Sequence, residues 1–225
     1  MRLTDRLGLT QRRQAALVRL LQLVMVGILS VGLYLGNAGV VVNAGVGLLV
    51  TQLPALLRRN YRFTMSVGIV LWITVAMFLH ALGTLPLPQL GFSTLYRSTW
   101  WWDHLTHALS SSLVAGVAYA TARALEEHSD AINLPDRFLF GYLLMFVMAF
   151  GVVWELVEFY LGVLSHLVGS GAILTQYGLS DTLLDLVYNT LGGLLVALFG
   201  TAYLTGVSDE LADRLGRSPE EDASE

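Results

Sequence analysis

The sequence predicts an all-α integral membrane protein with six transmembrane helices and both termini in the cytoplasm. Composition is the first reason, because 55% of the 225 residues are hydrophobic and the mean hydropathy is +0.62. Charged residues make up only 13% and lie mainly near the two ends and between apolar stretches. Soluble domains have about a quarter of their residues charged, so this composition is typical of a membrane protein.

Six apolar stretches are each long enough to cross the roughly 30 Å of bilayer hydrocarbon as a helix. Only Gly36-Asn37 separates the first two, which predicts a tight helical hairpin. We expect a cytoplasmic N-terminal segment over 1–15, a six-helix transmembrane domain over 16–205 and an acidic cytoplasmic tail over 206–225. The predicted spans cover residues 16–36, 38–57, 63–84, 100–124, 138–164 and 181–205.

Arginine placement predicts the orientation of these spans. All 13 basic residues are arginine, and they lie before the first span, between spans two and three, around the loop between spans four and five, and after span six. With an even number of spans, every arginine except Arg97 falls on one side. Positively charged loops favour the cytoplasmic side. The chain is therefore expected to be a multi-pass protein of the cell membrane with its termini inside.

Composition also limits the possible functions. The chain has no cysteine, so it forms no disulfide, thiolate metal site or thiol nucleophile. Its net charge of −4 gives no reason to expect a nucleic-acid partner. The expected partners are the lipid bilayer and a lipid-linked substrate, and nothing in the composition indicates an oligomeric state.

Polar residues lie inside three of the apolar stretches, at spacings that place each set on one helix face. Given the predicted orientation, all three sets lie in the outer half of their spans and can line one outward-facing pocket. Glycines on the same faces, at positions 151, 162, 192 and 193, would let the helices approach closely. The residues are Asp103 and His107 in the fourth span, Glu155 and Glu158 in the fifth, and Asp181, Asp185 and Asn189 in the sixth.

All seven residues are candidate catalytic residues. A charged Asp at the centre of a membrane helix costs about 2.5–3.5 kcal/mol, so such residues usually mark function. Carboxylates with a histidine suit Zn, Mn or Fe, and an all-oxygen set suits Mg; the candidate metal ligands are Asp103, His107, Glu158 and Asp185. Without a metal, a protonated acid beside an ionised one forms an acid/base pair. The alternative is a set of polar contacts that only tie helices together.

The order of these motifs resembles a known family. The motifs are Asp103…His107, Glu155-x-x-Glu158, and Gln176-Tyr177-Gly178 followed by Asp181-x-x-x-Asp185. They resemble the YjdF-like family of bacterial and archaeal inner-membrane proteins, a family of unknown function. Two departures are visible: Gln176-Tyr177-Gly178 stands where that family has a Gln-Gly-Asp run, and Glu158 stands where a second family, the VanZ-like proteins, has Gln.

A remoter resemblance is to the VanZ-like proteins linked to glycopeptide resistance. It is carried by Asp103-x-x-x-His107 and by Asp185, Asn189 and Gly192. Both resemblances cover about the last three spans. They imply a six-helix membrane protein and supply no reaction.

Three functions fit the sequence. The first is an enzyme that hydrolyses or transfers lipid or lipid-phosphate head groups with the help of a metal or a proton. The second is a proton- or cation-coupled transporter, since intramembrane acids suit both kinds of cargo. The third is a non-catalytic assembly or stress protein whose polar residues form a structural network.

Overall fold

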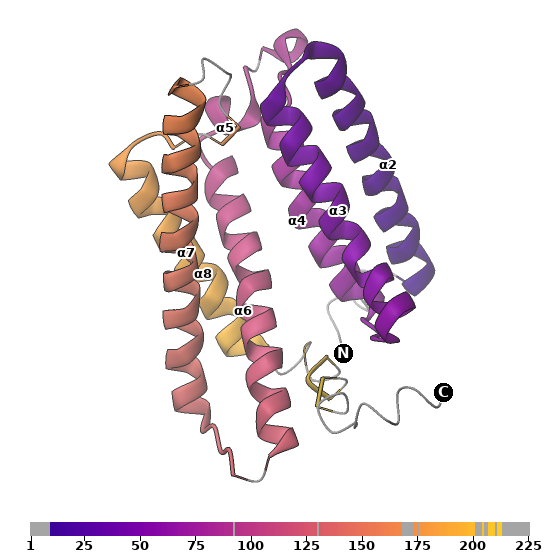
Figure 1. The fold of residues 1–225 in the computed structure, drawn as a ribbon, viewed down its shortest axis with the longest axis vertical. Helices are drawn as coiled ribbons and strands as arrows, with labels where there is room; N and C mark the ends of the chain where they lie inside the picture. Colours follow the sequence, from indigo (N-terminus) through magenta and orange to yellow (C-terminus); the bar gives the residue numbers. More distant parts are fainter. Residues whose placement is uncertain are drawn as a thin grey trace. The chain divides into compact units, whose positions relative to one another are not determined.

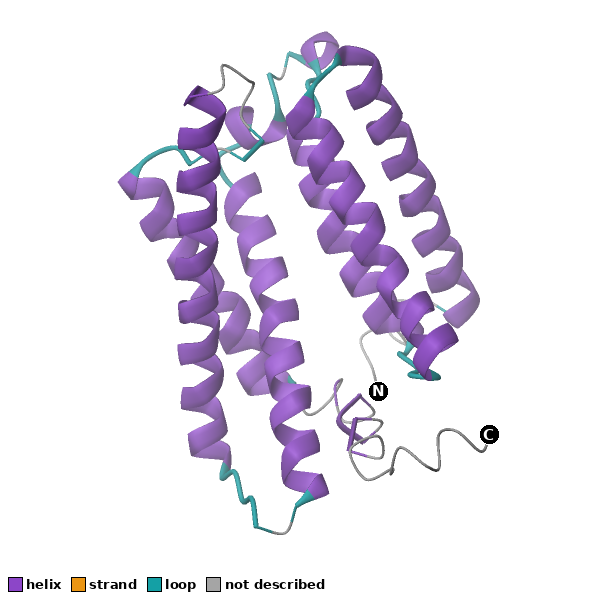
Figure 2. Cartoon of the chain, in the orientation of Figure 1, coloured by secondary structure: helices purple, strands orange, loops and turns teal. Residues whose placement is uncertain are grey.

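Every helix or strand element in the part of the chain that the computed structural model describes is a helix, which confirms the predicted all-α class. The described residues are 10–91, 93–129, 131–167, 173–174, 176–200, 204, 207–209 and 211–212, and they contain no β-strand (Figure 2). Most of the expected N-terminal segment and acidic tail lies outside them. In chain order the elements are α2 (Gln11–Leu35), α3 (Ala38–Tyr61), α4 (Val67–Thr84), the 3-10 turn η1 (Pro88–Leu90), α5 (Leu95–Ser98), α6 (Trp102–His128), α7 (Asp136–Leu167) and α8 (Leu179–Phe199), as Figure 1 shows.

Five of these helices are long and apolar enough to cross a membrane, namely α2, α3, α4, α7 and α8. The chain is therefore a multi-pass membrane protein. Helix α6 has 27 residues but is not among the five. Its N-terminal half contains Asp103, His104, His107 and the run Ser110–Ser112, which lower its hydropathy. The polar residues that include the candidate site residues of α6 are therefore the ones that lower its hydropathy.

By their internal contacts the residues divide into two compact units. The first comprises Met1–Thr106 and Glu155–Thr182, and the second comprises His107–Trp154 and Leu183–Glu225. The borders fall inside α6, α7 and α8, so each of these helices contributes residues to both units.

In the first unit, α2, α3 and α4 pack against one another (Figure 1). The predicted hairpin between the first two is confirmed: α2 ends at Gly36, whose φ of 63° suits glycine, and the Asn37 side chain caps α3 by accepting from the backbone N–H of Val40. A Cβ on Gly32 would lie 2.8 Å from the Val40 side chain, so the two helices touch closely just before the turn. The core of this unit consists of Met25, Ile28, Val40, Ala44 and Ala81.

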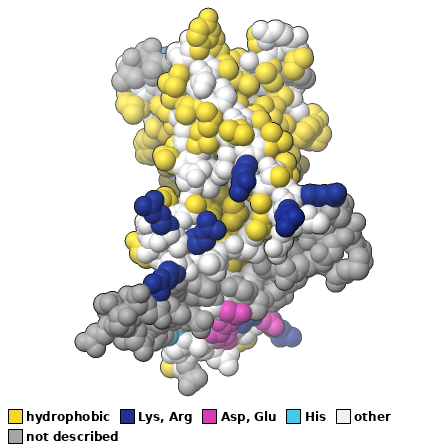
Figure 3. All heavy atoms as spheres, turned by 90° about the vertical axis from the view of Figure 1, so that its right-hand side faces the viewer, with side chains coloured by type: hydrophobic (Ala, Val, Ile, Leu, Met, Phe, Trp, Pro, Cys, Tyr) yellow, Lys and Arg dark blue, Asp and Glu magenta, His cyan; other side chains and the backbone are white. Residues whose placement is uncertain are grey.

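The outer surface of these helices is apolar, with large side chains such as Leu23 and Leu49 well exposed. Figure 3 shows hydrophobic side chains covering the upper part of this face and arginines gathered below them. Arg12 and Arg13 lie in the first turn of α2 and Arg58 and Arg59 in the last turn of α3, which the hairpin brings to the same end. This arrangement is that of a membrane-embedded surface with a charged border.

In the second unit, glycines bring α6, α7 and α8 together. A Cβ on Gly192 would lie 2.2 Å from the carbonyl oxygen of Ala108, and a Cβ on Gly193 would lie 3.2 Å from the Val147 side chain. A Cβ on Gly151 would lie 2.8 Å from the amide nitrogen of Asn189. The predicted close approach at these three glycines is confirmed. It is wrong for Gly162, which belongs to the first unit and has no described atom within 4 Å of the place of a Cβ, so no neighbouring helix touches it there.

Candidate functional site

Helix α6 carries the first two candidate residues, Asp103 and His107, one turn apart on one face. Asp103 lies in the first turn, where the partial positive charge of a helix N-terminus favours a carboxylate. Asp103 is half-buried, and His107 is buried with 6% of its surface exposed. Both residues thus lie at the start of a helix whose remaining length provides a rigid support.

Helix α8 supplies Asp185 and Asn189, again one turn apart, and both are buried. The Asp185 carboxylate lies 3.8 Å from Nε2 of His107. Oδ1 of Asn189 lies 3.3 Å from Nδ1 of His107 and accepts a hydrogen bond of 3.1 Å from the Ser111 hydroxyl. The single proton of this hydroxyl is shared with the backbone carbonyl of His107, which is its second acceptor. His107 is therefore held between two side chains of α8, one facing each ring nitrogen.

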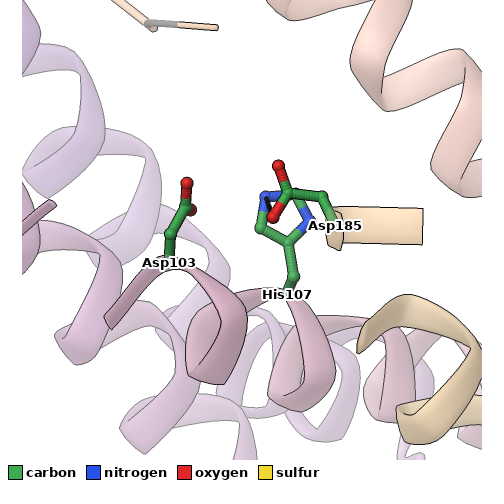
Figure 4. Close-up of side chains that lie close together, drawn as sticks. All are labelled: Asp103, His107 and Asp185. Atoms are coloured by element: carbon green, nitrogen blue, oxygen red, sulfur yellow. Dashed lines mark ion pairs between the residues drawn. The ribbon is translucent and has the colours of Figure 1, made fainter. Parts of the chain in front are cut away.

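Asp103, His107 and Asp185 form a group that can hold a metal ion (Figure 4). One ligand atom from each of them lies within 4.8 Å of the other two. Ligands at about 2.0–2.2 Å from a zinc ion are at most roughly 4.4 Å apart, so small side-chain movements would complete the set. Two carboxylates at this separation in a buried place repel each other unless a cation or a proton lies between them.

Glu155 and Asp181 belong to the first unit. Glu155 is buried on α7, and neither of its carboxylate oxygens has a hydrogen-bond partner in the part of the chain that the structure describes. Asp181 lies in the first turn of α8, and its carboxylate accepts a 2.8 Å hydrogen bond from the backbone N–H of Tyr177. This bond satisfies a backbone donor at the start of the helix, so Asp181 has a local structural role. Catalytic roles for both acids stay predictions.

Glu158 is not one of the three residues that the described structure groups as metal ligands. It is half-buried on α7, and its charge acts on Tyr96 of the same unit. Its place in the metal set stays a prediction. His104, which faces away from Asp103 and His107 along α6, packs its ring edge-on against Trp100 at a centroid distance of 6.3 Å.

Sequence reasoning missed a polar pair in the first unit, formed by Tyr96 and His80. The Tyr96 hydroxyl lies 2.7 Å from Nδ1 of His80 and 3.4 Å from the hydroxyl of Thr106, which in turn donates to the carbonyl of Asp103 at 2.8 Å. Burial raises the pKa of Tyr96, so the phenol keeps its proton, and its hydroxyl donates to Thr106. Gly83 makes the contact possible, since a Cβ there would lie 2.4 Å from the Tyr96 ring.

The signal for this pair is absent from the sequence, because Tyr96 lies in a four-residue helix outside every apolar stretch. Through Thr106 the pair is connected to the first turn of α6, where Asp103 lies. It therefore supports the backbone that carries one of the candidate ligands.

These features define a multi-pass helical membrane protein with a buried acid and imidazole group on its helices. The chain belongs to the family described as predicted membrane protein (DUF2238), which matches residues 16–206. This match bears out the resemblance to a YjdF-like membrane family, whereas the remoter resemblance to VanZ-like proteins gains nothing from it. No curated protein matches the chain. No solved structure matches it either.

Replacement of Tyr96 by Phe tests whether the pair supports the fold. The variant removes one hydroxyl that bonds His80 and Thr106, and a lost buried hydrogen bond of this kind costs about 1–2 kcal/mol. We expect the thermal unfolding midpoint in detergent to fall. Tyr34→Phe is the matched control, since Tyr34 is 89% exposed at the end of α2 and should leave the midpoint unchanged. Equal unfolding midpoints for the two variants would show that the Tyr96 hydroxyl does not stabilise the fold.

Proposed function

We propose that this protein is a membrane enzyme that hydrolyses or transfers lipid or lipid-phosphate head groups. The observation that carries the proposal is the group Asp103, His107 and Asp185, whose ligand atoms lie within 4.8 Å of one another on helices of a membrane protein. Buried acids and an imidazole in such helices are costly to insert, so a functional role explains their presence. Hydrolysis and group transfer are the reactions for which this set of side chains is best suited.

The proposal includes a sixth span and an orientation. With 27 residues at about 1.5 Å each, α6 is roughly 40 Å long and can cross the hydrocarbon despite its polar face. Six spans would put both termini, and every arginine except Arg97, on the cytoplasmic side. Asp103, at the start of α6, would then lie near the outer leaflet. A lipid head group lies at that same depth, whereas a soluble substrate would have no need of a site there.

In this reaction an ionised carboxylate of the group takes a proton from water or from an acceptor hydroxyl. The freed oxygen forms a bond to the phosphorus or carbonyl carbon of the head group, and the bond to the leaving oxygen breaks. The leaving oxygen takes back a proton from the protonated acid. Glu155, Glu158 and Asp181 are further acids that can store or pass protons in this scheme.

Arg97 supports an anionic substrate. It is the one arginine of the sequence on the proposed outer side, and its charge acts on the Tyr177 hydroxyl of the same unit. The charges of Asp103 and Asp181 also act on Tyr177. Arg97 therefore brings a positive charge to the surroundings of the acids, where a phosphate would otherwise be repelled.

Cysteine labelling tests the orientation, because the natural chain contains no cysteine. A single cysteine in place of Ser93 should react with a membrane-impermeant reagent in intact cells. A single cysteine in place of Ser129, in the loop between α6 and α7, should react only after the cells are opened. The reverse pattern would place the start of α6 at the inner leaflet and contradict a site that opens to the outside.

Replacement of Asp185 separates chemistry from scaffolding. Asp185→Asn keeps the shape and much of the hydrogen bonding but removes the charge, so we expect loss of head-group release with little loss of folded protein. Asp185→Leu should reduce the folded yield, because its polar partners then lie unsatisfied. Release would be measured by mass spectrometry after the purified protein is incubated with vesicles of bacterial lipid extract, and folded protein by size-exclusion chromatography.

The control for the amide variant is Asp209→Asn, since Asp209 is exposed and outside the group. It should release head groups at the wild-type rate. Wild-type release by Asp185→Asn would show that this acid takes no part in the chemistry. Uptake of a cation or proton without any head-group release would favour the transporter instead.

A further inference from the structure

His107 has different neighbours at its two ring nitrogens, and both neighbours lie in the second unit. Nδ1 lies 3.3 Å from the side-chain oxygen of Asn189, and Nε2 lies 3.8 Å from the Asp185 carboxylate. His107 is 6% exposed, Asp185 1% and Asn189 4%, so the surroundings of the imidazole are mostly protein. The protein therefore decides which nitrogen carries the proton.

Asn189 favours the tautomer of His107 that carries the proton on Nδ1. An amide oxygen can only accept a hydrogen bond, so the nitrogen opposite it must be the donor. In a neutral imidazole with a proton on Nδ1, Nε2 carries the unprotonated lone pair that can coordinate a metal, and this is the nitrogen that faces Asp185. Metal-binding histidines commonly donate their other N–H to an oxygen acceptor, which fixes the tautomer and the ring orientation.

The Asn189 amide lies where three helices meet. The Ser111 hydroxyl of α6 donates to the same amide oxygen at 3.1 Å. The amide nitrogen lies against α7 at Gly151, where any side chain would come within 2.8 Å of it. Asn189 comes from α8. The oxygen of this amide therefore points at His107 and its nitrogen points at the glycine.

We propose that Asp103, Nε2 of His107 and Asp185 bind a divalent transition metal such as Zn²⁺, and that Asn189 sets the tautomer of His107 for this purpose. The inference rests on the proposed function. It chooses between the two forms of that function and favours a metal-assisted reaction over one assisted by a proton alone. One imidazole with two carboxylates suits Zn, Mn or Fe, whereas Mg²⁺ prefers oxygen ligands alone. Bound there, such an ion would neutralise the two acids and activate a water or polarise the head group.

The first experiment measures zinc binding directly. The full-length protein is purified in mild detergent, stripped with a chelator and titrated with Zn²⁺ in the presence of excess Mg²⁺. We expect one Zn²⁺ per chain and loss of this binding in His107→Gln. Asn189→Leu should weaken it about 10–100-fold, as loss of the outer hydrogen bond to a metal-binding histidine does. Asn189→Asp, which keeps an acceptor oxygen opposite Nδ1, should restore it.

The matched control is Asn43→Leu. Asn43 is a partly buried asparagine on α3 that bonds the backbone carbonyls of Gly39 and Ile173, so its loss disturbs packing and leaves the α6 and α8 residues unchanged. This variant should bind zinc as the wild type does. Zinc binding equally weak in wild type and His107→Gln would overturn the metal site.

The second experiment measures the tautomer without any metal or substrate. Nitrogen chemical shifts of ¹⁵N-histidine-labelled, metal-free protein distinguish Nδ1–H from Nε2–H, and the signal of His107 is identified by its loss in His107→Gln. We expect Nδ1–H in wild type and Asn189→Asp, and loss of this preference in Asn189→Leu. Nε2–H in the wild type would overturn the role of Asn189. Intact zinc binding without head-group release would count against the proposed reaction and leave the metal site standing.

Discussion

Asp185 is a carboxylate with 1% of its surface exposed, on a helix otherwise apolar enough to cross a membrane. A charge in such a place must be neutralised by a neighbour, a proton or a cation. The second unit is arranged around this requirement. His107 lies within 3.8 Å of the acid, and Asn189 and Ser111 hold the imidazole in position. None of these side chains could be placed without a close approach of the helices.

The glycines of α7 and α8 allow that approach. Gly192 rests on the backbone of α6 at Ala108, one residue beyond His107, and Gly151 leaves room for the amide of Asn189. In a membrane, helices gain little from burying apolar surface against each other, because the lipid is equally apolar. Close backbone contact and polar bonds are the remaining sources of association, and here both occur at the same place. The proposed site is therefore also part of what holds this unit together.

Much of this could be predicted from the sequence, because the signals are local. Helix spacing places Asp103 above His107 and Asp185 above Asn189, and glycine in an apolar helix indicates close packing. Other features depend on contacts between distant segments. The bond from Tyr96 to His80 requires the short helix α5 to fold back on α4, which no periodic pattern indicates. The bond from Tyr177 to Asp181 arises at a helix start whose position the apolar pattern fixes only approximately.

The central claim is that the nitrogen of His107 facing Asp185 is a metal ligand. X-ray absorption at the zinc edge tests it most directly, on wild-type protein loaded with one equivalent of Zn²⁺. We expect a first shell of nitrogen and oxygen at about 2.0–2.1 Å with the outer scattering of a single imidazole. That outer scattering should vanish in His107→Gln. A zinc spectrum without imidazole scattering in the wild type, or one that His107→Gln leaves unchanged, would contradict the claim.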